Sequence, residues 1–291
     1  MSDSVSVLCP AKINLGLRVF PKRADGFHHI QSIFTTVNLF DELKVTVTGE
    51  RNTCRVNARG MKLPEENTFT KAYKAFCVLT GIDSGVLVEV DKKIPAGGGL
   101  GGGSSDASSF IQSLNSLFKA QLSDSDLHSL AGQVGSDVFF FTSALNADNG
   151  RRFGFYSPYC AVVGGRGEKI HEIEARNDFS VLLVMPGVEV STKEAYCLVD
   201  NAMNGNVKPF DNMEVTYRKN VADWNFVNDF TIPVCESYAA VGNALSEIRK
   251  CGADFADMSG SGSTVFGVFE DRKKALAARD CLEKKFRCFL A

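Results

Sequence analysis

The feature that most constrains this chain is a glycine-rich stretch at residues 93–106, with the sequence KIPAGGGLGGGSSD. Six of the 26 glycines of the chain lie between Gly97 and Gly103. Glycine reaches positive φ without steric cost and has no side chain, so the backbone N–H groups of such a stretch can approach a ligand closely. The pattern of residues predicts a strand before it, at residues 86–90, and an amphipathic helix after it. The apolar residues of that helix are Ala107, Phe110, Ile111, Leu114, Leu117 and Phe118.

The order of strand, glycine loop and helix predicts a phosphate-binding site. The first N–H groups of a helix have no partner within the helix and lie at the positive end of its dipole, so they attract anions. A flexible glycine linker is the alternative, but linkers rarely open directly onto an amphipathic helix. Two common phosphate motifs do not fit, because no Lys follows the glycines as in a P-loop and no suitable acid stands about 20 positions further on to bind a ribose.

Size and composition limit the class of protein. A chain of 291 residues predicts two domains, and we place the division at 1–160 and 161–291, because residues 146–168 are rich in Gly, Asn and Arg. A net charge of −2 indicates no general surface for nucleic acid or membranes. The nine cysteines are scattered and form no C-x-x-C pair, so we expect neither a disulfide framework nor a zinc site. The sequence also shows no signal-peptide pattern and no apolar run of membrane length. Together these observations favour a cytoplasmic protein.

Periodicity along the chain predicts a mixture of helices and strands, which favours an α+β fold. Residues 5–48 alternate as β structure, residues 138–141 look buried, and residues 201–230 are polar and irregular. Other elements are predicted as helices at 67–80, 123–134, 192–200, 234–248 and 271–286, and as strands at 181–185 and 265–269.

Three polar residues stand in apolar surroundings. Lys12 lies within a predicted strand, and Asn14, two residues further on, is on the same face of it. Asp137 precedes three phenylalanines, where an unpaired charge would be costly. We predict that Lys12 is the partner of Asp137. A plain structural ion pair, or an Asp that turns the chain at a helix end, is the alternative interpretation.

Two further segments carry weaker signals. His28 and His29 are adjacent and cannot face the same way on a strand, and no other ligands are spaced to complete a metal site with them. The second glycine–serine run, residues 258–264, predicts either a tight turn or an anion-binding nest.

Several of these segments occur in the order found in the GHMP kinases (galactose, homoserine, mevalonate and phosphomevalonate kinases), which the chain resembles over nearly its whole length. The segments that carry this resemblance are Pro10–Leu15, Pro95–Ser105 and Ser259–Gly262. Four further features resemble one branch of the family, whose members phosphorylate a cytidine diphosphate-linked methylerythritol on the non-mevalonate route to isoprenoid precursors. These features are Arg23–His28, the duplicated triple glycine, Gly135–Asp137 and Asn228–Asp229.

The resemblance implies an α+β protein with an N-terminal domain like ribosomal S5 domain 2 and a ferredoxin-like C-terminal domain. It implies that ATP, with Mg²⁺, lies over the glycine loop, with its phosphates at a helix that starts near Ser104. The implied ATP-binding residues are Pro95, Ala96, Gly97, Gly98, Gly99, Leu100, Gly101, Gly102, Gly103, Ser104 and Ser105. The implied substrate-binding residues are Asn14, Phe27, His28, Thr192 and Tyr196, of which Phe27, His28 and Tyr196 hold the cytosine.

The resemblance also implies a reaction. The γ-phosphoryl group of ATP would move to the tertiary 2-hydroxyl of the methylerythritol, with Asp137 accepting the proton and Lys12 steadying the charge. The partner would be this small molecule alone, without nucleic acid or membrane, and the protein would be a monomer or homodimer. Asp106 stands where family members often have Asn or Ala, and it would either help to hold Mg²⁺ or face solvent.

Two alternatives remain open. Another small-molecule GHMP kinase, of the homoserine or mevalonate type, would keep Lys12 and the glycine loop but would not need Phe27, His28 and Tyr196 to meet at a base. A non-catalytic ligand sensor of the same fold should have lost the proton acceptor, whereas Asp137 is present.

Overall fold

The computed structural model describes residues 3–60, 63–147, 158–202 and 207–291. The chain divides into two compact units that exchange segments. The first comprises residues 1–11, 39–95 and 101–157, and the second comprises residues 12–38, 96–100 and 158–291. Both units combine helices with strands, which confirms the predicted α+β class. The predicted division at residue 160 stays a prediction.

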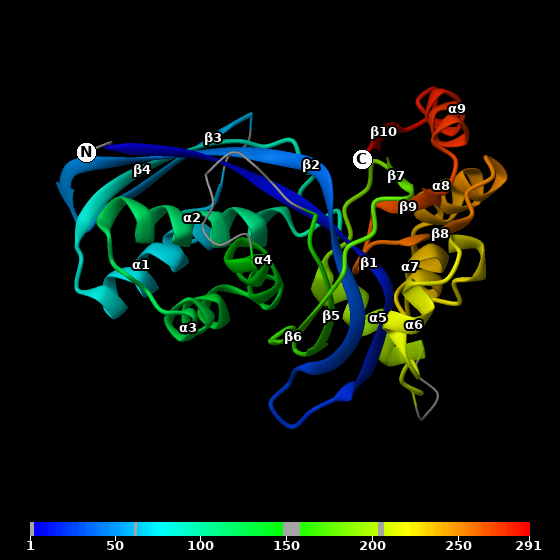
Figure 1. Cartoon of the computed structure of the whole chain (residues 1–291), viewed down its shortest axis with the longest axis horizontal. Coiled ribbons are helices and arrows are strands. Elements are labelled where there is room, and N and C mark those ends of the chain that lie inside the picture. Colours follow the sequence, from blue (N-terminus) through cyan, green and yellow to red (C-terminus); the bar gives the residue numbers. More distant parts are fainter. Residues whose placement is uncertain (1–2, 61–62, 148–157, 203–206) are drawn as a thin grey trace. The chain divides into compact units, whose positions relative to one another are not determined.

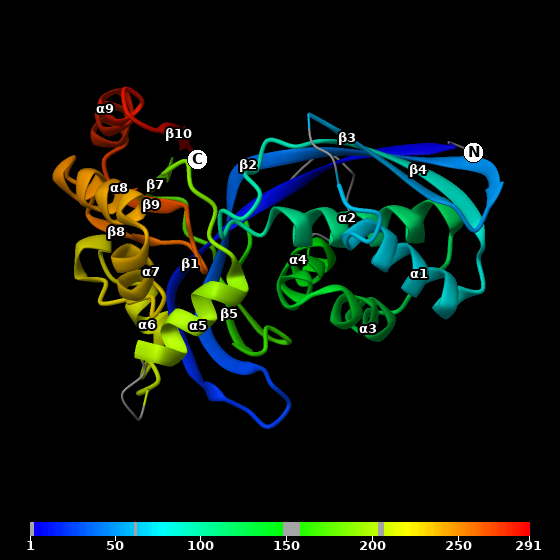
Figure 2. The ribbon, with the colours of Figure 1, turned by 180° about the vertical axis from the view of Figure 1, so that it is seen from behind.

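The first unit is a layer of strands covered on one face by four helices (Figures 1 and 2). Its sheet has the order β3 (Cys54–Arg59), β4 (Ser84–Asp91) and β2 (His28–Arg51), and β1 (Ser4–Lys22) pairs with β2. The helices are α1 (Thr68–Thr80), α2 (Gly102–Phe118), α3 (Asp124–Val134) and α4 (Ser136–Ala147). Apolar residues of the strands and helices form one buried core, which includes Val45, Val88, Phe69, Phe76, Phe110 and Leu114.

Local signals define the ends of the helices in the first unit. Asn67 caps α1, with its side chain accepting from Thr70 N–H, and Gly81 ends α1 in the left-handed region at φ 72°. Ser123 and Asp126 form the predicted capping box of α3. Helix α4, however, was not predicted. Its apolar residues 138–141 are buried all round, so they carry no clear helical period in the sequence.

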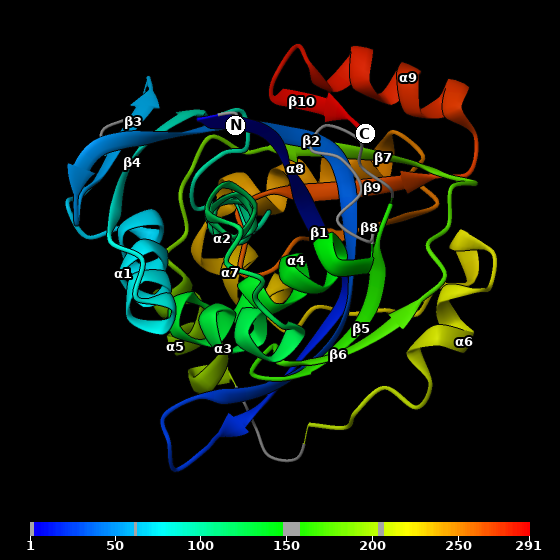
Figure 3. The same cartoon turned by 60° about the vertical axis from the view of Figure 1, so that its left-hand side comes forward.

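The second unit contains the remaining strands. Strands β5 (Cys160–Gly165) and β6 (Lys169–Ile173) extend the β2 sheet in antiparallel order. A separate antiparallel sheet has the order β10 (Arg287–Leu290), β7 (Ser180–Met185), β9 (Val265–Phe269) and β8 (Phe255–Met258). Helices α8 (Ala239–Lys250) and α9 (Arg272–Leu282) pack against β7 and β9, and Figure 3 shows this sheet with its helices. All six residues of β7 are buried, as expected for a central strand.

The predicted single helix at residues 234–248 is wrong. The structure has two helices there, α7 (Thr231–Ser237) and α8, and Tyr238 between them leaves the helical region with φ −126° and ψ 85°. Val234 and Val241 are both buried, so the apolar period continues through the break and hides it in the sequence. The closing helix also ends earlier than predicted, at Leu282, because the chain then enters β10.

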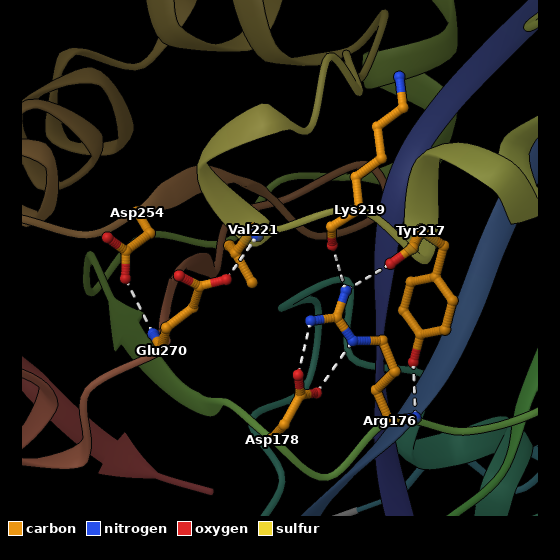
Figure 4. Close-up of polar contacts among 7 residues, drawn as sticks. All are labelled: Arg176, Asp178, Tyr217, Lys219, Val221, Asp254 and Glu270. Carbon is orange, nitrogen blue, oxygen red and sulfur yellow. Dashed lines mark hydrogen bonds and ion pairs between the residues drawn. The ribbon is translucent and has the colours of Figure 1, made fainter.

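The polar segment predicted as irregular is anchored by Arg176 (Figure 4). The guanidinium of Arg176 donates to the carboxylate of Asp178 at 2.9 and 2.8 Å, and to the carbonyl oxygens of Tyr217 and Lys219 at 2.5 and 2.6 Å. The Asp178 carboxylate raises the pKa of Arg176. The prediction that this segment is irregular is wrong in part, because it contains the short helix α6 (Met213–Tyr217) and a 3₁₀ turn at Val221–Asp223. The hydrogen bonds of Arg176 tie the end of α6 to the chain that precedes β7.

In the described parts of the chain, no helix is both long enough and apolar enough to cross a membrane.

Candidate active site

Strand β1 places Lys12 against the glycine loop in the second unit. Lys12 is only 2% exposed, and its ammonium donates to Asn14 Oδ1 at 2.6 Å and to the carbonyl oxygen of Gly99 at 3.0 Å. The ammonium also lies 4.8 Å from the centroid of the Phe34 ring. Main-chain bonding fixes the same approach, since Lys12 N–H donates to Leu100 O at 3.0 Å. A buried lysine with such defined partners is held at one position, as a residue that meets a phosphate requires.

The second glycine–serine run is the turn that supports the glycine loop. It connects β8 with β9, and Ser259 Oγ donates to Gly99 O at 2.9 Å. The N–H groups of Ser263 and Thr264 donate to the carbonyl oxygens of Gly97 and Gly98 at 3.3 and 3.2 Å. The two glycine-rich segments therefore form one structure, although about 160 residues separate them in the chain.

Gly99 is required by this contact. Its φ is 72°, in the left-handed region, and a Cβ atom there would lie 2.0 Å from the carbonyl oxygen of Ser259. Gly260 is similarly close to Lys12 and Asn14, because a Cβ on it would lie 3.3 Å from Lys12 Nζ and 3.4 Å from Asn14 Oδ1. At Gly99 and Gly260, therefore, backbone without a side chain lies next to the Lys12 ammonium.

Asn228 holds the supporting turn in place, a role that sequence reasoning did not identify. Its buried amide donates to the carbonyl oxygens of Met258 and Gly260, both at 2.8 Å, and its Oδ1 accepts from Phe230 N–H at 3.0 Å. The adjacent Asp229 forms an ion pair with Arg18 at 2.7 Å. The Asn-Asp pair was recognised only as part of a motif, and its position gave no indication of these distant partners.

His28 and Tyr196 come together in the second unit. Their rings are stacked, with centroids 4.8 Å apart and planes 26° apart, and Tyr196 also meets Phe230 edge-on at 4.9 Å. His28 Nδ1 lies 2.8 Å from the carbonyl oxygen of Phe20. A carbonyl oxygen can only accept, so Nδ1 carries a proton in this arrangement. The Nε2 atom lies 3.6 Å from Asp200 Oδ1, which is too far for a hydrogen bond.

Two other predicted substrate residues lie at exposed positions of the same unit. Phe27 is 47% exposed, and the guanidinium of Arg166 lies 4.7 Å from its ring centroid. Thr192 begins helix α5 (Thr192–Ala202), and its hydroxyl lies 3.3 Å from that of Ser261 in the supporting turn. Both side chains can therefore reach a ligand from solvent.

The first unit carries the helix that follows the glycines. Helix α2 begins at Gly102, two residues before the predicted start at Ser104, and its N-cap Gly101 is in the left-handed region at φ 71° with no side-chain cap. The first N–H groups of α2 therefore have no capping side chain to satisfy them, as an anion site requires. A Cβ atom on Gly103 would meet nothing within 4 Å, so the helix start is open at that residue.

Asp137 lies in the first turn of α4 and is half-buried. The structure therefore places it at the beginning of a helix, where a negative charge is favoured by the helix dipole. The predicted contact between Asp137 and Lys12 stays a prediction.

The expectation that Asp106 faces solvent is wrong. Asp106 is 2% exposed in α2, and its Oδ2 accepts a hydrogen bond from the ammonium of Lys92 at 2.6 Å. The Lys92 ammonium therefore occupies Oδ2 of this carboxylate, and the expected Mg²⁺ role of Asp106 stays a prediction. Among the described residues there is no group of three or more His, Cys, Asp or Glu side chains that could hold a metal.

Comparison with known proteins identifies the family. The family model for the GHMP kinases N terminal domain matches residues 67–144, and that for GHMP kinases C terminal matches residues 220–288. A 4-diphosphocytidyl-2-C-methyl-D-erythritol kinase of Treponema pallidum is 36% identical over 98% of this chain and 96% of its own length. The chain belongs to the GHMP kinase family. A second relative of this GHMP kinase, from Prosthecochloris aestuarii and with the same name, is 35% identical over 98% of the chain and 96% of its own length.

Solved structures agree with this assignment. A crystal structure of 4-(cytidine 5'-diphospho)-2C-methyl-D-erythritol kinase is 28% identical to this GHMP kinase, with a TM-score of 0.76 over 98% of both chains. The homoserine kinase of Cytophaga hutchinsonii is 17% identical, with a TM-score of 0.62 over 100% of this chain and 94% of its own, and that likeness concerns the fold alone. These matches confirm the two-domain GHMP architecture that the sequence predicted.

Proposed function

We propose that this GHMP kinase transfers the γ-phosphoryl group of ATP to the 2-hydroxyl of 4-(cytidine 5'-diphospho)-2-C-methyl-D-erythritol. The observation that carries this proposal is the similarity to kinases of that name over nearly the whole chain, at 36% and 35% identity. The protein is an ATP-dependent small-molecule kinase of the non-mevalonate isoprenoid route. As part of the same proposal, it acts in the cytoplasm as a monomer or homodimer, without nucleic acid or membrane.

ATP is proposed to bind over Pro95–Ser105, with its phosphates at the start of α2. The positive φ of Gly97, Gly99 and Gly101 supports this placement, because a chain of such conformations can expose its N–H groups to a phosphate. Mg²⁺ is proposed to arrive with ATP and to be held mainly by phosphate oxygens and water, as Mg²⁺ usually is in kinases. When bound, it would neutralise charge on the transferred group.

Lys12 and Asp137 are proposed as the catalytic residues. Asp137 would accept the proton of the 2-hydroxyl as that oxygen attacks the γ-phosphorus and the bond to the β-phosphate oxygen breaks. Lys12, held by Asn14 and Gly99, would stabilise the negative charge of the reacting groups, and Asn14 would contact the substrate. The rigid support of Lys12 favours this role, since positioning and fixed electrostatics supply most of the rate in phosphoryl transfer.

Cytosine recognition is assigned to Phe27, His28 and Tyr196, with Thr192 nearby. The proton on His28 Nδ1 leaves Nε2 as an acceptor in the neutral ring, and the 4-amino group of cytosine is a matching donor. Uracil has a carbonyl oxygen at that position, so an acceptor would face an acceptor. Phe27 offers an exposed ring face on which a base can stack.

Base selection supplies a test of this pocket. With the uridine analogue of the substrate, we expect kcat/KM to be about 10- to 100-fold lower than with the cytidine substrate, because a buried polar group is left unpaired. His28→Ala should shrink this preference, and His29→Ala, on the neighbouring strand position, should retain it. Steady-state kinetics with both substrates measure the ratio, and equal turnover of the two by the wild type would contradict the assignment.

The function itself is tested by substrate competition. ATP consumption should be rapid with the cytidine-linked methylerythritol and close to background with homoserine or mevalonate, since those substrates have no base for the His28 pocket. ³¹P NMR of the product should show a new phosphomonoester. Turnover of homoserine or mevalonate in place of the cytidine-linked compound would support the other GHMP kinase type, and no turnover of any of the three would support the non-catalytic sensor.

A further inference from the structure

A buried cluster of three charges lies beside the start of α2, and the mechanism above does not use it. Its members are Asp41 of β2, Lys92 directly after β4, and Asp106 of α2. Asp41 is fully buried and Asp106 is 2% exposed. The Lys92 ammonium donates to Asp41 Oδ2 and, at 2.6 Å, to Asp106 Oδ2. Burial of three charges is costly, so such a cluster points to a role beyond packing.

The cluster holds both ends of the glycine-rich segment. Asp41 Oδ1 accepts from the N–H groups of Lys93 and Ile94 at 2.6 and 2.8 Å, which fixes the chain just before Pro95. The start of α2 rests on the same support, because a Cβ on Gly102 would lie 2.9 Å from Ile94 Cγ2 and 3.4 Å from Asp41 Oδ2. The conformation of the helix end that would receive phosphate therefore depends on this cluster.

One proton decides the charge of the cluster. Two carboxylates and one ammonium carry a net charge of −1 when all three are ionised. Asp41 accepts three hydrogen bonds from nitrogen, whereas Asp106 accepts one from the Lys92 ammonium and a weak one from the Cys9 thiol. Among the described residues, no nitrogen or oxygen donor reaches the buried Asp106 Oδ1. The neutralising proton therefore belongs on Asp106.

The surroundings of Asp106 agree with this assignment. Burial raises the pKa of Asp106 to about 7, the charge of Lys92 works against this rise, and the charge of Asp41 adds to it. The third ionisable group that faces Asp106 is the thiol of Cys9 on β1, and burial together with the Asp106 charge raises the pKa of that thiol well above its usual value. Burial alone would lower the pKa of Lys92, but the two carboxylates raise it, so Lys92 keeps its charge.

We propose that Asp106 is a positioning residue that controls the electrostatic potential at the phosphate-binding end of α2, and that its protonated form favours ATP. With Asp106 protonated the cluster is neutral, so the positive end of the α2 dipole attracts the phosphates with no nearby net negative charge to weaken that attraction. With Asp106 ionised, a buried negative charge near that end repels them. Linkage requires the reverse effect as well, so bound ATP raises the pKa of Asp106 further. This inference rests on the proposed placement of ATP at Pro95–Ser105.

The test compares the wild type with Asp106→Asn, which keeps the shape of the protonated acid and cannot ionise. KM for ATP is measured for both proteins from about pH 6 to about pH 8.5, a range that spans the titration. The ratio of the wild-type KM to the variant KM removes the titration of ATP itself. We expect a ratio near one at the acid end that rises about three- to tenfold at the alkaline end, as one partly screened charge would produce.

A matched control and a second measurement keep the inference open to failure. Glu42→Gln removes an exposed charge from the same strand, where Glu42 pairs with Lys93, and its KM ratio should not change with pH. Thermal unfolding without ATP, followed from about pH 4 upwards, should show the wild type losing stability relative to Asp106→Asn as pH rises towards about 7, with no further loss above it. The sign follows because the folded state, with its raised pKa, binds the proton more tightly than the unfolded state.

The outcomes separate this inference from the proposed function. A KM ratio that stays flat with pH, while Gly103→Ala at the open start of α2 still raises KM for ATP, overturns the role of Asp106 alone. If neither variant changes KM for ATP, the placement of ATP on the glycine loop falls as well. A ratio that rises with a midpoint near pH 7, together with the matching shift in unfolding temperature, supports the inference.

Discussion

Asp137→Asn is expected to lower kcat by about 10²- to 10⁴-fold, the usual contribution of a general base, while KM for ATP changes little. The amide keeps the size of the carboxylate but cannot accept the proton of the 2-hydroxyl. That hydroxyl is tertiary and a poor nucleophile, so it depends on the base. ATP binding should survive, because the proposed phosphate contacts come from the glycine loop and from α2. Single-turnover phosphoryl transfer, together with calorimetric titration of ATP, measures the two effects separately.

Asp124→Asn is the matched control for this experiment. Asp124 occupies the first turn of α3 as Asp137 occupies the first turn of α4, so both substitutions remove a negative charge from a helix start. Asp124 is exposed, and its carboxylate accepts a hydrogen bond from the side-chain amide of Asn146 at 3.1 Å. We expect this control to keep kcat within about twofold, as surface substitutions usually do. Equal kcat values for wild type and Asp137→Asn would remove Asp137 from the mechanism.

Gly99→Ala should impair both folding and catalysis. The added Cβ would lie 2.0 Å from the carbonyl oxygen of Ser259, and the left-handed φ of 72° adds about 1 kcal/mol of backbone strain. The β8–β9 turn must therefore move away from the loop. Because Gly99 O accepts a hydrogen bond from the Lys12 ammonium, we expect Lys12 to shift together with the loop. We expect a loss of about 3 kcal/mol in unfolding free energy. In kcat/KM we expect a loss on the order of 100-fold, because a misplaced reactive group costs about that much.

Two other glycines separate the causes of this loss. Gly252 also has a positive φ, 82°, but a Cβ on it would meet nothing within 4 Å, so Gly252→Ala measures backbone strain without a clash. Gly103→Ala adds a Cβ in open space at the start of α2, so it should leave stability intact and raise KM for ATP only. Urea unfolding and steady-state kinetics on the three variants measure these effects. A Gly99→Ala protein as stable and active as Gly252→Ala would show that the contact with Ser259 is unimportant.

Several parts of the fold could be predicted because their causes are local. The capping box of Ser123 and Asp126 involves residues three positions apart, and Gly81 ends α1 through its own backbone conformation. The apolar period of α2 reflects burial of one helix face. For the same reason the placement of Lys12 and Asn14 on one face of β1 followed from their spacing, and the direct contact between them confirms it.

Other features depend on residues that are far apart in the chain. The break at Tyr238 was invisible because buried residues on either side continue the same period. Asp106 was expected to help to hold a metal or to face solvent. The second alternative is wrong, because Asp106 is buried and accepts a hydrogen bond from Lys92, whose ammonium also donates to Asp41. A side chain's exposure is set by what packs on it, and local sequence does not contain that information.

The amino-acid sequence alone was enough for the fold class, because helix and strand periodicity are properties of short segments, and the resemblance of its motifs was enough for the family. The phosphate-binding role of the glycine loop stays a prediction. Tertiary structure decided how the loop is supported. Ser259 donates to Gly99 and Asn228 holds the turn between β8 and β9, across separations of 160 and about 30 residues. Which donors meet which carbonyl oxygens there depends on how distant strands are paired, and local sequence does not contain that pairing.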